Sequence, residues 1–187
     1  MEKTNKCRWG ILGAAFIAHK NWQAIRDAGN AELVAVASRD LSRAKAFISE
    51  CQVSAPHPVE PEAMDSYDAL LARTDIDAIY IPLPTGVRKE WVLRAAATGK
   101  HVLVEKPVGC AAADVAEIIA ACEQHHVQFM DGVMFMHGRR LKRLREVLDN
   151  DLGRIRHIAT LQRDALGVRH RRVSGGHERR RDAGNAG

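Results

Sequence analysis

Short runs of apolar residues alternate along most of the chain with longer segments whose apolar residues recur every three or four positions. The short runs are typical of buried strands, and the longer segments are typical of amphipathic helices. This pattern predicts strands over residues 7–12, 31–38, 77–82, 101–105, 128–136 and 155–161. It predicts helices over residues 16–28, 43–51, 67–71, 87–98, 111–124 and 141–148.

Capping and turn-forming residues delimit these elements. Ser66 is predicted to cap the helix 67–71, and either Asp40 or Ser42 to cap the helix that begins at residue 43. Residues 52–61 are rich in proline and polar residues and predict a loop. Two sets of apolar residues are expected in the core: Val115, Ile118, Ile119 and Cys122, and then Met130, Met134 and Met136.

Strands that alternate with helices are typical of βαβ units on a parallel sheet. We therefore predict the α/β class, with a Rossmann-type doubly wound parallel sheet followed by only a remnant of a second α/β domain. The predicted boundaries are 1–136 for the first domain, 137–162 for the start of the second and 163–187 for a basic, disordered tail.

The length of 187 residues allows one domain, or one domain and a fragment. No apolar run approaches the ~20 residues of a membrane span, and the polar first residues do not resemble a signal peptide. We expect a cytoplasmic protein without a membrane partner. The four cysteines have no CxxC spacing, so neither a metal site nor a disulfide framework is expected.

The net charge of +5 is concentrated at one end of the chain. Residues 163–187 contain seven Arg and three acidic residues, which leaves 21 Lys and Arg against 20 Asp and Glu elsewhere. A nucleic-acid binder that uses this tail is one hypothesis. It ranks last, because the body is nearly neutral and no aromatic residues are interleaved with the arginines.

The first predicted strand runs into the segment GILGAAFIA, residues 10–18, at the position of a dinucleotide-binding turn. Gly13 occupies the place of the first glycine of GxGxxG, while Ala15 and Ala18 replace the second and third. Backbone amides at such a turn can hold a pyrophosphate. An ordinary strand-to-helix turn with small residues is the alternative interpretation.

Ser38 and Arg39 end the second predicted strand, where NAD-selective sites usually carry an acidic residue. Arg39 can instead pair with a 2′-phosphate and stack on adenine, with Ser38 as a further donor. This favours NADP, with NAD as the other cofactor to consider. A solvated arginine at the start of the next helix is the alternative.

The next long strand ends in a turn with two prolines. This turn, formed by Pro82, Leu83, Pro84 and Thr85, can support a nicotinamide ribose, or it can simply end the strand. Arg88 follows three residues later and faces the same crevice, unless it is a surface charge beside Lys89.

Residues 102–107, VLVEKP, place Glu105, Lys106 and Pro107 at the carboxyl end of a buried strand. Ligands bind at this edge of open α/β sheets. A lysine beside a cofactor can hydrogen-bond a substrate hydroxyl and assist proton transfer, and the glutamate can orient it. A surface ion pair is the alternative interpretation.

These motifs, in this order, resemble the Gfo/Idh/MocA family, the group of glucose–fructose oxidoreductase and inositol dehydrogenase, over about residues 6–161. The segments GAAFIA, SR, YIPLPTGVRKEWV, AAATGKHVLVEKP and FMDGVMFMHGRRL carry the resemblance. Dihydrodiol and sugar dehydrogenases are the most similar branch.

The resemblance implies an NAD(P)-dependent oxidoreductase that acts on the CH–OH group of a sugar, polyol or diol. Lys106 matches the family's catalytic-site lysine. The positions that the resemblance and the turns assign to the cofactor are Gly13, Ala14, Ala15, Phe16, Ile17, Ser38, Arg39, Pro82, Leu83, Pro84, Thr85, Arg88, Glu105, Lys106 and Pro107. Thr85 and Arg88 depart from the Asn and His of many members.

Members of the family usually run well past 300 residues, form oligomers through a second domain and complete the active site there. Here the resemblance ends near Gln162, and the Arg-, Gly- and Ala-rich tail suggests a shifted reading frame or a genuine basic tail. We expect little or no activity from this chain, so a non-catalytic NADP-binding module is the alternative function. Sequencing the locus tests the frameshift.

Overall fold

The computed structural model describes residues 6–150, 163–164 and 167–168. The chain divides into two compact units, Met1–Met134 and Phe135–Gly187. The predicted boundary after residue 136 falls close to this division. Within the part of the chain that the structure describes, no helix is both long and apolar enough to cross a membrane.

The first unit is built on a six-stranded sheet in which every neighbouring pair of strands is parallel. The strand order is β3-β2-β1-β4-β5-β6. The strands are β1 (Cys7–Leu12), β2 (Ala31–Ala37), β3 (Glu62–Met64), β4 (Ala78–Ile81), β5 (His101–Val104) and β6 (Phe129–Asp131). This is the Rossmann-type α/β fold that the sequence predicts.

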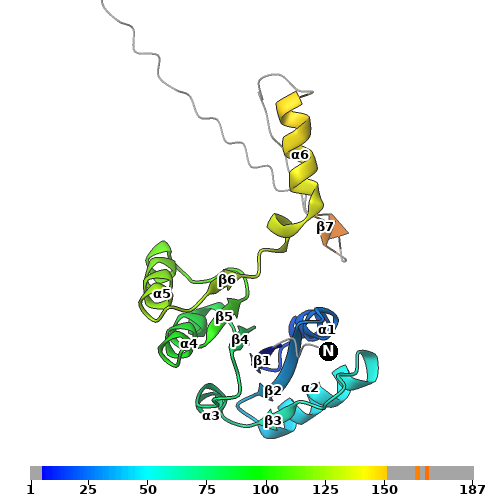
Figure 1. Cartoon of the computed structure of the whole chain (residues 1–187), viewed down its shortest axis with the longest axis vertical. Helices are drawn as coiled ribbons and strands as arrows, with labels where there is room; N and C mark the ends of the chain where they lie inside the picture. Colours follow the sequence, from blue (N-terminus) through cyan, green and yellow to red (C-terminus); the bar gives the residue numbers. More distant parts are fainter. Residues whose placement is uncertain (1–5, 151–162, 165–166, 169–187) are drawn as a thin grey trace, which may run out of the picture. The chain divides into compact units, whose positions relative to one another are not determined.

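Helices cover both faces of the sheet (Figure 1). The helices α1 (Ala18–Asp27) and α2 (Leu41–Ser54) pack on one face around the buried Trp22 and Phe47. The other face is covered by α3 (Tyr67–Leu71), α4 (Thr85–Ala97) and α5 (Ala112–Gln124), around Leu70, Val92 and Ile118. Both faces of the parallel sheet are therefore buried, as its continuous apolar strands require.

The two predicted N-caps are confirmed. Asp40 is the N-cap of α2 and accepts a hydrogen bond from the Ser42 amide at 2.8 Å. Ser66 caps α3 by accepting from the Ala69 amide at 3.2 Å. Gly99 ends α4 with a φ of 74°, which favours a residue without a Cβ atom.

Two boundaries in the first unit differ from the prediction. Residues 52–61 are not wholly a loop, because α2 continues to Ser54, and the strand β3 that follows was not predicted. The short edge strand Glu-Ala-Met has no apolar alternation that would reveal it. The predicted strand 128–136 is confined to β6, because the Asp131 carboxylate accepts from the Val133 amide at 3.0 Å and turns the chain away.

Several predicted core residues are exposed. Ile119 is 41% exposed, because the buried stripe of α5 passes through Ile118 and Cys122 and leaves Ile119 on the helix flank. Met130, on the edge strand β6, is 46% exposed, and Met134 is 66% exposed. Met130 lies on this edge strand and Met134 follows it, and within the described residues no further strand pairs with β6 on its outer side.

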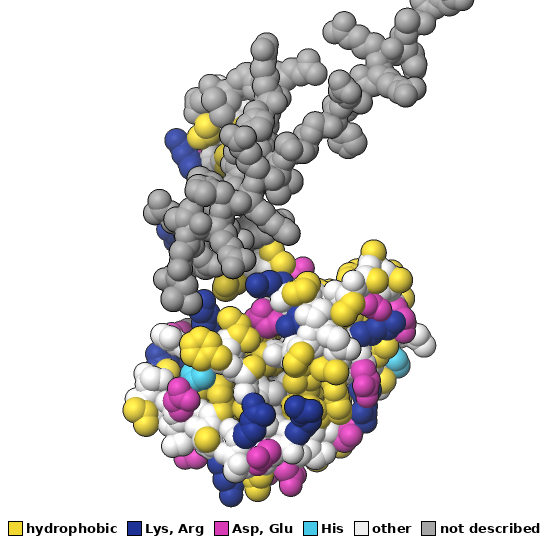
Figure 2. Space-filling view, turned by 180° about the vertical axis from the view of Figure 1, so that it is seen from behind, with side chains coloured by type: hydrophobic (Ala, Val, Ile, Leu, Met, Phe, Trp, Pro, Cys, Tyr) yellow, Lys and Arg dark blue, Asp and Glu magenta, His cyan; other side chains and the backbone are white. Residues whose placement is uncertain are grey.

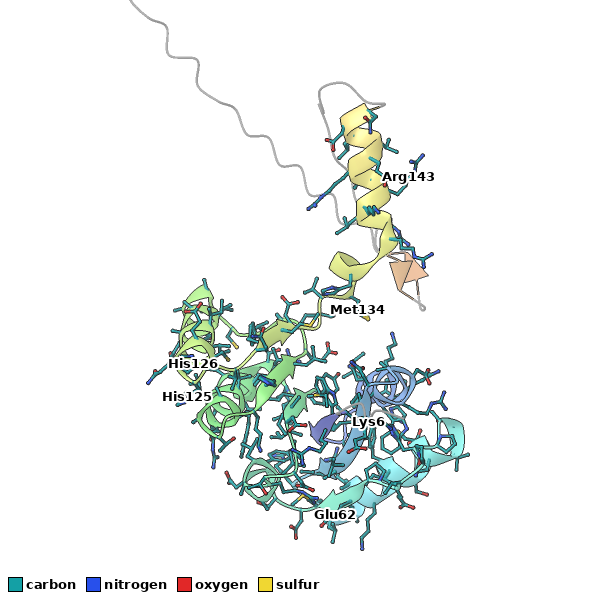
Figure 3. All side chains as sticks on the ribbon, in the orientation of Figure 1. Lys6, Glu62, His125, His126, Met134 and Arg143 are labelled. Atoms are coloured by element: carbon teal, nitrogen blue, oxygen red, sulfur yellow. The ribbon has the colours of Figure 1, made fainter. Side chains whose placement is uncertain are left out.

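In the second unit, α6 (Arg139–Asn150) follows a short 3₁₀ helix (Met134–His137) and confirms the helix predicted over residues 141–148. It buries none of its residues, and its Arg143 is labelled in Figure 3. Within the predicted basic tail, β7 (Arg163–Asp164) pairs antiparallel with β8 (Gly167–Val168). The predicted strand 155–161 lies outside the described residues, as does the rest of the tail.

Charged side chains of both signs cover the surface of the first unit. On the face drawn in Figure 2, Lys and Arg are interspersed with Asp and Glu, and hydrophobic side chains lie between them. Arg8 and Asp77 form one such pair at the amino ends of β1 and β4. The Asp77 carboxylate accepts from the Arg8 amide at 2.8 Å and from its Nη2 at 2.7 Å.

Replacement of Asp77 by Asn should destabilise the first unit in a pH-dependent way. Hydrogen bonds from the Arg8 side chain hold the pKa of Asp77 below its usual value. Because the native pKa lies below that of the unfolded chain, the stabilisation is present above about pH 4 and is lost as the pH falls through the native pKa. We expect Asp77→Asn to cost about 0.5–1 kcal/mol at pH 7, since both side chains are partly exposed.

Thermal unfolding from pH 7 down to pH 3 provides the measurement. The difference in Tm between the wild type and Asp77→Asn should narrow as the pH falls. Glu60→Gln is the matched control, because Glu60 is exposed and forms no ion pair within the described residues. A constant difference across the range would contradict the role of the carboxylate charge.

Candidate functional site

The strand order of the sheet reverses between β1 and β4, which are neighbours although other strands separate them in sequence. In such sheets a crevice opens beyond the carboxyl ends of the two strands, and ligands bind there. The chain leaves β1 through Gly13 and leaves β4 through Pro82 and Leu83. The two sequence-predicted turns therefore lie side by side at the edge where this fold predicts the crevice, and they are its expected walls.

Gly13 closes the first wall. Its φ is +124°, a value that L side chains rarely adopt, and its amide donates to the Ala37 carbonyl at 2.8 Å. A Cβ atom at this position would lie 2.8 Å from Cδ2 of Leu83. The two walls approach each other so closely that only glycine fits.

The residues after Gly13 present backbone donors. Among the described residues, no acceptor is found for the amides of Ala14, Phe16 and Ile17, which lead into the amino end of α1. The amino end of a helix carries partial positive charge and favours anions. Phe16 is 88% exposed, so its ring leaves this backbone open.

Ser38 and Arg39 lie at the end of β2. Ser38 is buried, and its amide donates to the Met64 carbonyl at 3.0 Å. Arg39 is exposed and forms no ion pair with a described residue. The neighbouring Asp40 is engaged as the cap of α2, where hydrogen bonds from Ser42 lower its pKa.

Arg39 lines a cavity of about 470 Å³ beside the crevice. The sequence did not assign Tyr67 and Trp91 to a site, yet both line this cavity, with ring centroids 5.0 Å apart. Val87 and Trp91 are four residues apart and therefore lie on the same side of α4. This spacing is the sequence pattern that could have indicated that Trp91 lines the cavity together with Val87. The full lining is Arg39, Asp65, Ser66, Tyr67, Leu83, Pro84, Val87 and Trp91.

Arg88 is buried, so its interpretation as a surface charge is wrong. Its guanidinium donates to the carbonyls of Leu83, Glu105 and Pro107, at 2.9 Å in the case of Glu105. Burial lowers the pKa of Arg88, but an arginine remains protonated. Arg88 therefore joins the turn after β4 to the segment after β5.

Glu105 is buried beside Tyr80. The phenol of Tyr80 donates to Oε1 of Glu105 at 2.8 Å, and the backbone amide of Lys106 donates to Oε2 at 3.3 Å. Burial, and then the hydrogen bond to Glu105, raise the pKa of Tyr80. The phenol therefore keeps its proton at neutral pH.

Lys106 is exposed at the carboxyl end of β5, and the Lys106–Pro107 peptide bond is cis. Within the described residues, its ammonium forms no ion pair. Thr85 begins α4, and Pro84 precedes it as the N-cap residue. The part of the chain that the structure describes contains no cluster of His, Cys, Asp or Glu suited to a metal ion.

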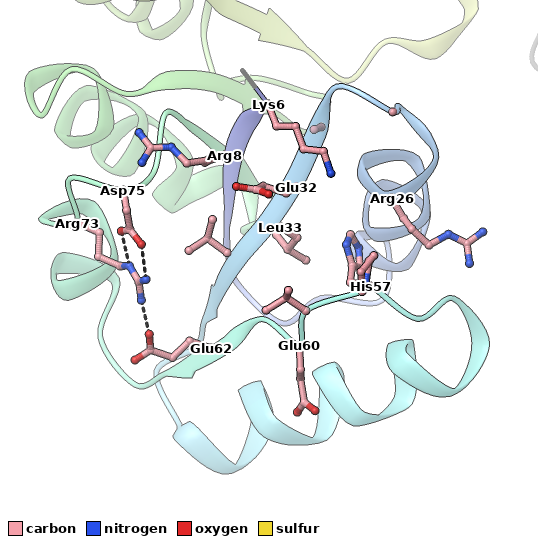
Figure 4. A pocket seen from close by; sticks show the side chains of 15 residues that line it. Lys6, Arg8, Arg26, Glu32, Leu33, His57, Glu60, Glu62, Arg73 and Asp75 are labelled. Atoms are coloured by element: carbon pink, nitrogen blue, oxygen red, sulfur yellow. Dashed lines mark hydrogen bonds and ion pairs between the residues drawn. The ribbon is translucent and has the colours of Figure 1, made fainter. Parts of the chain in front are cut away.

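A cavity of about 530 Å³ lies at the opposite edge of the sheet, near the amino ends of β1 and β2 (Figure 4). Its Arg73 is paired with Asp75 at 2.7 Å and also with Glu62, and its Arg8 is paired with Asp77. These side chains satisfy one another. The cavity of about 470 Å³ is the better candidate, because it is lined by Arg39, which has no ion-pair partner among the described residues, and by Leu83, which closes on Gly13.

Comparison with known proteins shows the family of the chain. A family model described as the oxidoreductase family with an NAD-binding Rossmann fold matches residues 7–133. The chain belongs to the Gfo/Idh/MocA family. The members are oxidoreductases, and the matched segment contains the whole sheet and both walls of the crevice.

The relatives are dehydrogenases and reductases. The chain is 38% identical to D-xylose 1-dehydrogenase (NADP(+)) 2 of Haloferax volcanii, over 79% of this chain and 43% of that protein. It is 34% identical to trans-1,2-dihydrobenzene-1,2-diol dehydrogenase of Mus musculus, over 75% of this chain and 41% of that protein. The chain thus spans less than half the length of these relatives.

A solved structure of KijD10, a 3-ketoreductase from Actinomadura kijaniata, in complex with TDP-benzene and NADP, has the same fold. It superposes with a TM-score of 0.70 at 34% identity, covering 78% of this chain and 44% of the other. The Gfo/Idh/MocA assignment therefore holds in sequence and in three dimensions.

Replacement of Gly13 by Ala tests the contact between the walls. We expect a loss of about 1–3 kcal/mol, because the new Cβ must displace Leu83 and also occupy a positive φ. Urea unfolding gives the measurement. Gly29→Ala has a positive φ but open space, so it should cost less; an equal loss in both variants would argue against the contact.

Proposed function

We propose that the crevice binds NADP(H) and that the chain provides the cofactor-binding part of an oxidoreductase. The observation that carries the proposal is the position of Arg39, unpaired within the described residues, in the cavity next to the turn of Gly13. A guanidinium there can pair with the 2′-phosphate and stack on adenine. The free amides of Ala14, Phe16 and Ile17 suit the pyrophosphate.

The proposed reaction is hydride transfer between a CH–OH carbon of a sugar, polyol or diol and the nicotinamide ring. The names of the xylose and dihydrodiol dehydrogenases support this substrate class. In the oxidation direction, the carbon would give its hydride to the nicotinamide ring, and the hydroxyl group would release its proton to water. The exposed ammonium of Lys106 is the group we assign to hydrogen-bond that oxygen.

A nucleotide-binding module without turnover is the second candidate. The described residues supply both walls of the crevice, but Lys106 is the side chain among them to which we assign a part in the chemistry. The chain also spans less than half of its dehydrogenase relatives. The small-molecule partner, the cytoplasmic location, the lack of a nucleic-acid partner and the oligomeric state of longer relatives stay predictions.

A titration that compares NADPH with NADH tests the proposal. We expect the wild type to bind NADPH more tightly, and Arg39→Glu to weaken NADPH by about tenfold or more with little effect on NADH. Isothermal calorimetry gives both dissociation constants. Assays with a polyol or diol then separate an enzyme from a binding module.

Lys45→Glu makes the same change of charge on the exposed surface of α2 and should leave both affinities nearly unchanged at physiological salt. A loss of NADPH and NADH binding by the same factor in Arg39→Glu would remove the 2′-phosphate role. If neither nucleotide binds to the folded wild type, the proposed function is wrong.

A further inference from the structure

The side chain of Tyr80 and the backbone of Gly132 lie close to the carboxylate of Glu105. Tyr80 is completely buried, and its hydroxyl donates to Oε1 at 2.8 Å. Near the same carboxylate, a Cβ atom added to Gly132 would lie 3.2 Å from Oε2 and 3.3 Å from Oε1. The amide of Gly132 donates to the Val104 carbonyl at 2.7 Å, so this backbone is itself fixed.

Glu105 contacts the next residue through the backbone rather than through an ion pair. Its Oε2 accepts from the Lys106 amide at 3.3 Å, whereas the ammonium of Lys106 has no carboxylate partner among the described residues. The Glu105 carboxylate and the Lys106 ammonium therefore form no ion pair with each other, although the two residues are adjacent in sequence.

The geometry points to Tyr80 as a positioning residue for Lys106. We infer that the phenol holds the Glu105 carboxylate in the protein interior, and that this keeps the Lys106 ammonium free to act in the crevice. Tyr80 does not itself touch the proposed substrate. The inference rests on the proposed function, because it explains how the side chain assigned to the chemistry stays available.

The physical reason is the cost of an unsatisfied buried carboxylate. A buried carboxylate needs hydrogen-bond donors in place of water. If the phenol of Tyr80 is removed, the Glu105 carboxylate is expected to bind another donor. Arg88 is not free to replace the phenol, because its guanidinium already donates to the carbonyls of Leu83, Glu105 and Pro107. The adjacent Lys106 ammonium has no carboxylate partner among the described residues, so it is available for capture, and its capture would remove it from the crevice.

The first test uses Tyr80→Phe and an NMR signal of Lys106. Reductive methylation with ¹³C labels the lysines, and the Lys106 resonance is the one that is missing in Lys106→Arg. We expect Tyr80→Phe to shift this resonance, and Tyr80→Phe combined with Glu105→Gln to return it towards the wild-type position. This signal does not depend on nucleotide binding.

The second test separates the two halves of the cofactor. Lys106 is also one of the positions assigned to the cofactor, on its nicotinamide side. Tyr80→Phe should therefore weaken NADPH about tenfold, while the affinity for adenosine 2′,5′-bisphosphate, which lacks the nicotinamide half, changes by less than about twofold. A general loss of structure would weaken both ligands. Thr98→Val is the matched control, since it removes a hydroxyl that donates to the Ala95 carbonyl at 2.9 Å away from the crevice.

An unchanged Lys106 resonance in folded Tyr80→Phe, or equal losses for both ligands, would overturn the inference. If Tyr80→Phe does not fold, Gly132→Ala disturbs the same carboxylate from another side and must shift the same resonance. Should the wild type bind no NADPH, the proposed function fails, but the resonance still decides the role of Tyr80.

Discussion

The crevice depends on the buried guanidinium of Arg88. Its donors reach carbonyl groups in two segments, the turn that follows β4 and the segment that follows β5. Burial disfavours its charge, and three carbonyl dipoles compensate for the loss of water. Because the same side chain holds Leu83 and Glu105, it fixes the distance between the wall of the cofactor crevice and the strand end that bears Lys106.

The two segments that Arg88 joins make different contacts. Leu83 closes on Gly13 from one side, which restricts the turn after β1 to a residue without a Cβ atom and leaves backbone amides facing the crevice. Glu105 is held from the other side by Tyr80. The turn after β1 thus has backbone amides without an acceptor among the described residues, and the segment after β5 has an exposed ammonium. A parallel sheet brings them together because its carboxyl ends share one edge.

The sequence predicted the features that depend on local pattern. Continuous apolar runs identify β1, β2, β4 and β5, and the glycine, proline and lysine positions at their ends follow from chain chemistry. It did not reveal the three-residue strand β3, nor the exposure of Met130, because both depend on a position at the edge of the sheet. It also could not show that Arg88 is buried, since the carbonyls that bind it come from separate segments.

The same limit applies to Glu105 and Lys106, for which the sequence allows either a glutamate that orients the lysine or a surface ion pair. Both residues follow the end of β5, and their surroundings differ because Glu105 is buried whereas Lys106 is exposed. Tyr80 faces Glu105 from the neighbouring strand, and β4 and β5 run in register at Tyr80 and Leu103. The hydrogen-bond partner of Glu105 is therefore Tyr80 on the neighbouring strand, and Lys106 remains exposed. Outside the basic tail the chain has almost no net charge, and an ammonium without an ion-pair partner among the described residues is there a local means of attracting an electron-rich ligand.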